Sequence, residues 1–320
     1  MKRNFYKGLF FTAAAAFLIV LPFLTPTYSL ATEMLIFAIF ALGFDILFGY
    51  TGLLSFGHAI FFGLGAYATG IVLVRVIPSL FVALSVGIAL SLVISYVVAF
   101  LSIQKRGIYF VMITLAFCQM FYFIGFKWTS LTGGDNGLHG VPRTSFGPVD
   151  LNSEITLYFY VLILFLLSVF IAYRIVNSPF GRVLKALKDN EDRARSVGYD
   201  TTIFKTAAFV ISALFGSLAG GLYAVHSNFV PIDTLSINTS GDVVIMALLG
   251  GIGTLYGPVL GAMLVVYLKN LLSNWLGNWH LILGGIFILS VLTVRQGIFP
   301  VLFGKVREKL WSQKQDPGQG

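Results

Sequence analysis

Charged residues and cysteine are both scarce in this chain of 320 residues. Only 11% of the residues are Asp, Glu, Lys or Arg, whereas 57% are hydrophobic. A soluble domain has about 25% charged residues, so the composition excludes an ordinary soluble protein. Cys118 is the only cysteine and lies in an apolar run, which excludes a disulfide framework and a thiolate metal site. The sequence therefore predicts an all-α polytopic membrane protein.

The signatures of common nucleotide-binding and hydrolytic sites are also missing. The chain has no G-x-x-x-x-G-K-[ST] phosphate loop, no H-E-x-x-H zinc motif and no G-x-S-x-G nucleophile motif. His58 has no possible metal ligand three or four residues further on. Asp200 and Asp242 only vaguely suggest an intramembrane aspartyl protease, because Thr239 stands where that motif has glycine. We therefore expect no catalytic residue, no metal site and no cofactor bound by this chain.

Long apolar runs approach the ~20 residues that a helix needs to cross the hydrocarbon core of a membrane. The run at 242–269 is too long for a single span, and glycines interrupt it around Gly250–Pro258. We expect two short or broken helices there, and about 8–10 transmembrane helices with Gly-rich breaks in all. The runs lie at 8–25, 34–50, 58–76, 79–101, 107–126, 155–175, 203–225, 242–269 and 279–297.

The distribution of Lys and Arg predicts the orientation of the chain, because basic residues keep loops on the cytoplasmic side. The basic N-terminus is expected inside, the segment 127–154 outside and the charged stretch Ser178–Asp200 inside. If the run at 242–269 forms two helices and not one, the basic C-terminal tail lies on the cytoplasmic side. We expect one transmembrane domain over 1–304 and a cytoplasmic tail over 305–320. Basic cytoplasmic loops also explain the net charge of +8, so no nucleic-acid partner is expected.

The stretch Ser178–Asp200 is the only long charged run in the chain, and it carries helix signals. Ser178 followed by Pro179 is typical of a helix start, Gly198 suits a helix end, and Asp200 can cap the next helix. One alternative is a solvated amphipathic helix that rests on the bilayer. The other is a docking helix whose apolar stripe fits a groove in a soluble partner. The stripe consists of Val183, Leu184, Leu187, Ala194 and Val197.

Two glycine-rich breaks, Gly49–His58 and Gly250–Pro258, interrupt the apolar runs. Non-helical backbone at membrane depth is tolerated only when it is buried in protein or lines a wet cavity. Paired interruptions of this kind indicate a transport path between related halves. Structural hydrogen bonding and close helix packing remain alternative roles for the same residues. The candidates for the translocation path are Asp45, Thr51, Ser55, His58, Gly250 and Gly253.

Four motifs, which occur in the family's order, resemble the branched-chain amino acid ABC transporter permeases of the LivM type. The resemblance covers nearly the whole chain. The motifs are GYTGLLSFGHAIFFGLGAYATG at 49–70, TGGDNGL at 132–138, SPFGRVLKALKDNEDRARSVGYD at 178–200 and ALLGGIGTLYGPVLGA at 247–262.

The resemblance implies a permease subunit of an ABC importer in the bacterial inner membrane. The implied partners are a second permease of the LivH type, two cytoplasmic ATPase subunits that bind ATP and Mg, a periplasmic binding protein and the lipid bilayer. It also implies that loop 177–202 couples the chain to the ATPase, with a partial match to an E-A-A-x-x-x-G pattern in which Arg193 replaces the first alanine. The implied coupling residues are Arg182, Lys185, Asn190, Glu191, Arg193, Ala194 and Gly198.

The substrate expected from the resemblance is a branched-chain, hydrophobic amino acid. A urea or short-chain amide permease stays open as an alternative, because the family architecture includes both. A stand-alone secondary transporter or channel is a further alternative from a different class. Uptake that requires ATP and a co-purified ATPase would distinguish an importer subunit from such a protein.

Overall fold

The structure is a computed structural model that describes residues 25–143 and 151–275, together with positions 18, 20–22, 282, 284, 285 and 288. Within these residues, seven helices are long and apolar enough to cross a membrane, which confirms the expected all-α polytopic fold. The spans expected at 8–25 and 279–297 and the tail at 305–320 lie largely or wholly outside the described residues. The long helices are α2 (Tyr28–Thr51), α3 (His58–Arg75), α4 (Leu80–Ser102), α5 (Ile108–Lys127), α7 (Glu154–Val176), α10 (Thr201–Ser227) and α12 (Tyr256–Trp275).

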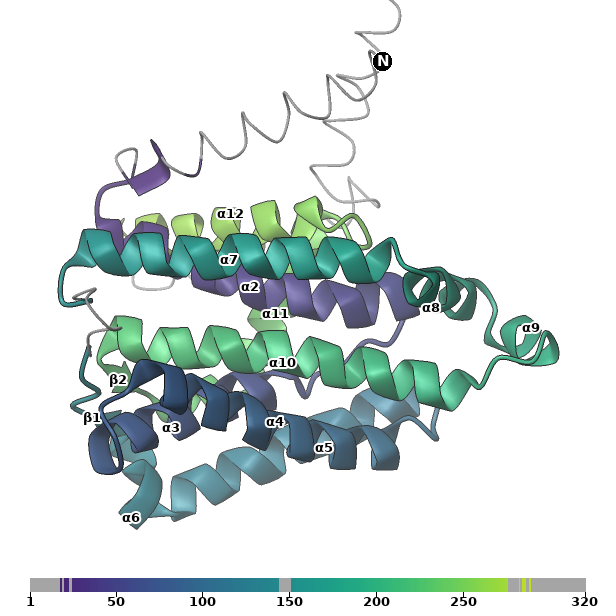
Figure 1. The fold of residues 1–320 in the computed structure, drawn as a ribbon, viewed down its shortest axis with the longest axis horizontal. Coiled ribbons are helices and arrows are strands. Elements are labelled where there is room, and N and C mark those ends of the chain that lie inside the picture. The colour runs from purple at the N-terminus through teal and green to yellow at the C-terminus, as the bar shows by residue number, and fades with distance from the viewer. Residues whose placement is uncertain are drawn as a thin grey trace, which may run out of the picture.

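Most of the short elements lie at the two ends of the long helices, whereas α11 lies within the bundle (Figure 1). One end, here called the β1–β2 end, has strands that pair antiparallel, with Leu138 opposite Val230. The opposite end, here called the α8–α9 end, carries the two helices of the charged stretch. The short elements are α6 (Thr129–Thr132), η1 (Gly134–Asn136), β1 (Leu138–His139), α8 (Pro179–Asp189), α9 (Glu191–Ser196), β2 (Phe229–Val230), η2 (Ile232–Leu235) and α11 (Ile237–Gly250).

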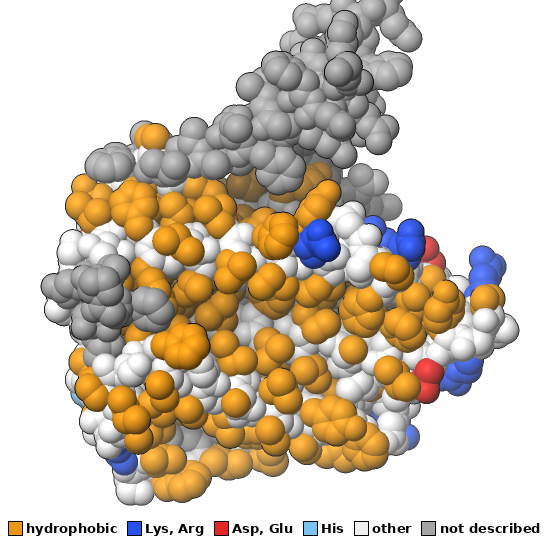
Figure 2. All heavy atoms as spheres, viewed as in Figure 1, with side chains coloured by type: hydrophobic (Ala, Val, Ile, Leu, Met, Phe, Trp, Pro, Cys, Tyr) orange, Lys and Arg blue, Asp and Glu red, His pale blue; other side chains and the backbone are white. Residues whose placement is uncertain are grey.

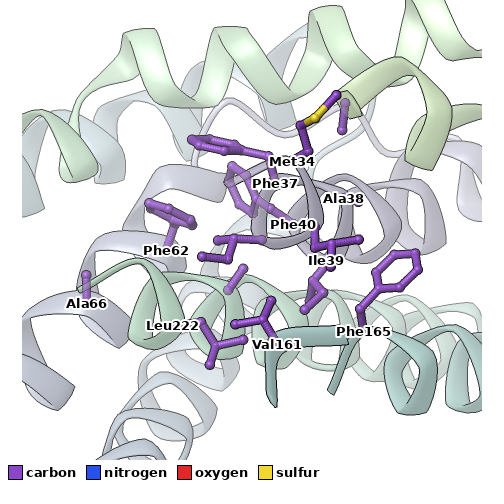
Figure 3. Close-up of a cluster of buried hydrophobic side chains, with 14 of the residues drawn as sticks. Met34, Phe37, Ala38, Ile39, Phe40, Phe62, Ala66, Val161, Phe165 and Leu222 are labelled. Atoms are coloured by element: carbon purple, nitrogen blue, oxygen red, sulfur yellow. The ribbon is translucent and has the colours of Figure 1, made fainter. Parts of the chain in front are cut away.

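Helix α2 is the centre of the bundle, and 94% of its most apolar stretch is buried. Phe37 and Phe40 of α2 pack against Phe62 of α3 (Figure 3). The centroid of the Phe62 ring lies 5.7 Å from that of Phe37 and 4.8 Å from that of Phe40. Glycines bring α3 and α10 into close contact, because a Cβ on Gly65 would overlap the backbone of Ser217. Lipid tails offer no hydrophobic drive for helices to associate, so such small residues are the usual basis of packing in membranes.

The outer helices expose large apolar side chains along their length. Phe81 on α4, Met112 on α5 and Ile163 on α7 are each more than 60% exposed. On the face shown in Figure 2, hydrophobic side chains cover the long helices, whereas Lys, Arg, Asp and Glu gather mainly over α8 and α9. This distribution fits a bilayer around the bundle, with the α8–α9 end in water.

Two helices begin inside the bundle instead of at its ends. Helix α2 ends at Thr51, the non-helical segment 52–57 follows, and α3 then starts at His58. The start of α11 meets the start of α3, because the Ser240 hydroxyl accepts a hydrogen bond from the Ala59 amide at 2.9 Å. Ser240 also lies 4.0 Å from Cys118, which is near the middle of α5. The hydroxyl therefore satisfies a buried amide at the start of a helix.

The break expected within 242–269 is present. Helix α11 ends at Gly250 and α12 begins at Tyr256, so the long apolar run is two helices, as expected. A Cβ on Gly250 would overlap the carbonyl of Gly257, and one on Gly261 would overlap the carbonyl of Met246. The two helices therefore cross in direct backbone contact, which only glycine allows at these positions.

Candidate functional site at the α8–α9 end

The charged stretch forms two capped helices, as its sequence predicts. The Ser178 hydroxyl accepts a hydrogen bond from the Gly181 amide at 3.3 Å, and Pro179 occupies the first turn of α8. The Asn190 side chain caps α9 by accepting from the Arg193 amide at 2.9 Å. Side-chain acceptors at these positions satisfy amides that the helix itself leaves unpaired.

Gly198 ends α9 in a left-handed conformation, with φ at 97°. The Tyr199 amide bonds to the Ala194 carbonyl, and the Gly198 amide bonds to the Arg195 carbonyl. This pair of bonds is a Schellman motif, which favours glycine because the conformation penalises a side chain. Asp200 then caps α10 through the amides of Thr202 and Ile203. The expected roles of Gly198 and Asp200 in helix capping are confirmed.

Four of the five residues of the apolar stripe face the bundle, which contradicts both alternatives for them, contact with the bilayer and insertion into the groove of a partner. Val183, Leu184, Leu187 and Ala194 are buried within the chain, in a cluster that includes Tyr50 of α2. Only Val197 is exposed, at 73%. The bundle covers the stripe because α8 folds back under the ends of α2, α7 and α10, where burying it removes apolar surface from water.

Glu191 is the centre of an ion-pair cluster at the start of α9. Its carboxylate pairs with Lys205 of α10 at 2.5 Å, with Arg106 at 3.2 Å and with Arg195 at 3.7 Å. Arg106 lies in the α4–α5 connection and also binds Asp192 at 2.9 Å. The hydrogen bond to Asp192 and the charge of Glu191 raise the pKa of Arg106 above its ordinary value. The cluster therefore fastens α9 to two other parts of the chain.

The three basic residues among the implied coupling residues present their side chains to solvent. Arg182, Lys185 and Arg193 are exposed, and the Lys185 ammonium lies 5.3 Å from the centroid of the Tyr50 ring. By contrast, Glu191 and Ala194 face the bundle. A groove of about 340 Å³ lies beside Arg182, between α8 and the start of α10. Its lining comprises Pro179, Phe180, Arg182, Val183, Ala186, Tyr199 and Phe204.

Asp45 lies inside the bundle and holds the second glycine-rich break. Its side chain is fully buried, and its two carboxylate oxygens accept hydrogen bonds from the amides of Gly253 at 2.7 Å and Leu255 at 3.2 Å. Leu255 has a left-handed backbone, with φ at 60°, which costs a residue with a side chain about 1–2 kcal/mol. The hydrogen bonds to the carboxylate thus stabilise the strained backbone of the break.

Lys188 connects the charged stretch to the same place. Its ammonium donates a hydrogen bond at 2.7 Å to the carbonyl of Gly49, in the last turn of α2. Sequence reasoning missed Lys188, since nothing in its spacing distinguishes it from Lys185 one turn earlier. A Cβ on Gly49 would overlap the Asp45 carboxylate and lie 2.7 Å from the Gly253 amide. Asp45, Gly49, Lys188, Gly253 and Leu255 are called the Asp45–Lys188 junction below.

The other candidates for a translocation path make local or buried contacts. Thr51 donates to the Leu47 carbonyl, and Ser55 accepts from the Gly57 amide at 3.2 Å. His58 is fully buried, and its Nε2 lies 2.7 Å from the Ser212 hydroxyl. Gly250 packs on α12, as described above. Of the path candidates, the structure brings Asp45 and Gly253 together, and in the described part of the chain no group of His, Cys, Asp and Glu could hold a metal ion.

Known proteins resemble this chain over most of its length. The high-affinity branched-chain amino acid transport system permease protein LivM of Salmonella typhimurium is 28% identical, covering 92% of this chain and 75% of that protein. The protein of the same name from Escherichia coli K12 is 27% identical over the same shares. The autoinducer 2 import system permease protein LsrC of Photorhabdus laumondii is 30% identical over 41% of each chain.

No solved structure matches the chain. Residues 27–292 match the family described as branched-chain amino acid transport system / permease component, and this range contains every described helix from α2 to α12. A multi-pass bundle with a water-facing, charged pair of helices at one end is consistent with such a component. The chain belongs to the family of permease components of branched-chain amino acid transport systems.

Proposed function

We propose that this chain is the membrane-spanning permease subunit of an ABC importer for branched-chain amino acids. The observation that carries the proposal is the similarity to two LivM proteins over 92% of the chain, within the matching family. The relatives named for branched-chain amino acids cover far more of the chain than the LsrC relative does. They also favour this substrate class over urea and short-chain amides.

The proposed assembly contains a second permease of the LivH type, two ATPase subunits and a periplasmic binding protein. ATP and Mg would bind to the ATPase subunits, since this chain has no phosphate loop of the Walker type. The chain itself would be a transport subunit and not an enzyme. The charge at the α8–α9 end supports a cytoplasmic position for that end, in the inner membrane of a bacterium. The termini would then also lie in the cytoplasm, and residues 1–304 would form one permease domain.

The exposed side of α8 and α9 is the proposed contact with the ATPase. Arg182, Lys185 and Arg193 offer cations to a partner, and the groove beside Arg182 offers an apolar recess. Because the stripe of α8 packs on the bundle, movement of α8 would displace the helices that it touches. Import then follows alternating access, in which ATP favours one of two states of the assembly by its differential affinity.

The test is uptake by the whole assembly in proteoliposomes, with the binding protein and ATP on the appropriate sides. We expect the ATPase subunits to co-purify with this chain, and labelled leucine to accumulate only when ATP is hydrolysed. Labelled urea and a Walker-lysine variant of the ATPase subunit are the controls, and neither should give uptake. Leucine uptake by this chain alone, without ATPase subunits, would refute the proposal in favour of a stand-alone transporter.

A further inference from the structure

We infer that Asp45 and Lys188 are positioning residues that connect the α8 helix to the α11–α12 break during transport. This inference rests on the proposed function, because it assigns to α8 the movement that an ATPase would impose. It concerns how that movement reaches the membrane-spanning helices. Neither side chain need touch the substrate for this role.

The first link is between α8 and the end of α2. Lys188 of α8 donates to the Gly49 carbonyl at 2.7 Å, and its Cγ would lie 3.4 Å from a Cβ on Gly52. The last carbonyls of a helix lack partners within that helix and carry partial negative charge. A lysine ammonium is a suitable partner for them. Lys188 thus joins α8 to the helix at the centre of the bundle by a charge-assisted hydrogen bond.

The second link is between α2 and the α11–α12 break. Asp45 lies one turn before Gly49 on α2, and its carboxylate accepts from the amides of Gly253 and Leu255. Both carboxylate oxygens therefore accept hydrogen bonds from backbone amides of the break. The contacts of Lys188 and Asp45 meet at Gly49, where any side chain would overlap the Asp45 carboxylate.

The break is a segment whose conformation depends on such support. Gly251, Gly253 and Leu255 all have positive φ, at 111°, 77° and 60°. Leucine is strained in this region, so the turn persists only where its surroundings hold it. The Lys188 ammonium also approaches the turn directly, lying 3.7 Å from the position of a Cβ on Gly253. A displacement of α8 therefore acts on one compact cluster of α2 and the break, and through it on α12.

The experiment measures leucine imported per ATP hydrolysed by the reconstituted assembly, together with the amount of ATPase that co-purifies. The main variant is Lys188→Met, which keeps the length of the side chain and removes the donor. It lies at the water-facing end, so it should insert and fold normally. Asp45→Asn is the second variant, since an amide retains one acceptor of the two. Lys105→Met, at an exposed lysine in the α4–α5 connection, is the matched control.

We expect Lys188→Met and Asp45→Asn to retain the ATPase and each to import about tenfold less leucine per ATP, a typical size for coupling between sites. The double variant should be no worse than the more severe single variant, because both act through one junction. Lys188→Arg should restore most of the import, and Lys105→Met should resemble the wild type. A merely structural role would lower protein yield without changing this ratio.

Two results would overturn the inference while leaving the proposed function intact. One is a Lys188→Met assembly with the wild-type ratio of import to hydrolysis. The other is a Lys188→Met chain that no longer retains the ATPase, which would make Lys188 a docking contact. Absence of ATP-dependent uptake by the wild-type assembly would instead refute the proposed function, and with it the inference.

Discussion

The ammonium group of Lys205 lies 2.5 Å from Oε2 of Glu191, and only 5% of the lysine side chain is exposed. Glu191 belongs to α9, whereas Lys205 belongs to the first turns of α10. Because the glutamate is itself only 16% exposed, this contact differs from an ordinary surface salt bridge. This buried ion pair joins α9 to α10 and therefore contributes to the stability of the α8–α9 end.

Removing the charge of Glu191 should destabilise the protein, because it leaves Lys205 buried without its counter-ion. For Glu191→Gln we expect a loss of about 3 kcal/mol, the cost of breaking a buried pair by removing one partner. The measurement is the apparent melting temperature of the detergent-solubilised chain. Asp192→Asn is the control, since the Asp192 side chain is 77% exposed and its loss should cost under about 1 kcal/mol. Equal effects of the two variants would contradict a special role for the buried pair.

Replacing Gly198 should disturb the end of α9 through its backbone alone, because nothing lies within 4 Å of a Cβ there. Gly198→Val should cost about 1–2 kcal/mol, since φ is positive, and weaken ATPase association. Gly198→Asn should be milder, because asparagine tolerates this conformation better. Gly140, with φ at 75° and open space at the β1–β2 end, provides the control. If Gly140→Val weakens ATPase association equally, the effect is general instability and not loss of α9 geometry.

Charge reversal at Arg193 should reduce ATPase association while membrane insertion stays intact. The Arg193 side chain is exposed, whereas the neighbouring Arg195 binds Glu191 and Thr201 within the chain. We expect Arg193→Glu to weaken association by about tenfold or more, as truncation of charged interface pairs commonly does. Co-purification of the ATPase subunits measures this. Arg75→Glu, at an exposed arginine near the β1–β2 end, should leave association unchanged, and unchanged association of Arg193→Glu would argue against this contact.

A side chain at Gly220 should disrupt the packing of α10 on α3. A Cβ there would overlap the carbonyl of Phe62, a backbone atom that cannot rotate away. We expect Gly220→Ala to cost about 1–3 kcal/mol through overpacking, visible as a lower melting temperature. Gly241→Ala is the matched control on α11, where no atom lies within 4 Å and alanine should stabilise the helix by about 0.5–1 kcal/mol. Similar melting temperatures for both variants would contradict the close approach at Gly220.

Removing the hydroxyl of Ser240 should leave the Ala59 amide unpaired at the buried start of α3. We expect Ser240→Ala to lower stability by about 1–3 kcal/mol, the cost of an unsatisfied buried group. Ser273→Ala is the control, because that exposed hydroxyl bonds only to the nearby Asn270 carbonyl among the contacts described for it. Thermal unfolding in detergent compares the two variants. A neutral Ser240→Ala would show that another acceptor serves the Ala59 amide.

The sequence allowed the local features of the α8–α9 end to be predicted, because each depends on a few neighbouring residues. Ser178, Gly198 and Asp200 cap helices through bonds that span only two to five residues. The division of 242–269 into two helices followed from length and glycine content in the same way. The direction of the apolar stripe could not be predicted. An amphipathic helix shows that one face will be covered, but not whether its own bundle or a partner covers it.

The role of Asp45 in the structure also lay beyond the sequence. The residue is polar within an apolar run, which marks it as unusual and leaves both a transport path and a structural hydrogen bond open as roles. Its partner amide at Gly253 is 208 positions away. Almost every residue has a backbone amide, so the sequence does not show which amide a buried carboxylate will bind. Lys188 carried even less signal, because it is one of several basic residues in a charged stretch.

Membrane insertion, helix positions and the capped helices of the charged stretch are therefore properties of the sequence by itself, since apolar length and local hydrogen bonding decide them. The burial of the stripe, the pairing of Glu191 with Lys205 and the Asp45–Lys188 junction were decided only by the tertiary structure. Each depends on which distant segments come together when the helices pack, and that choice arises from the shape of the whole bundle and not from any short stretch of it.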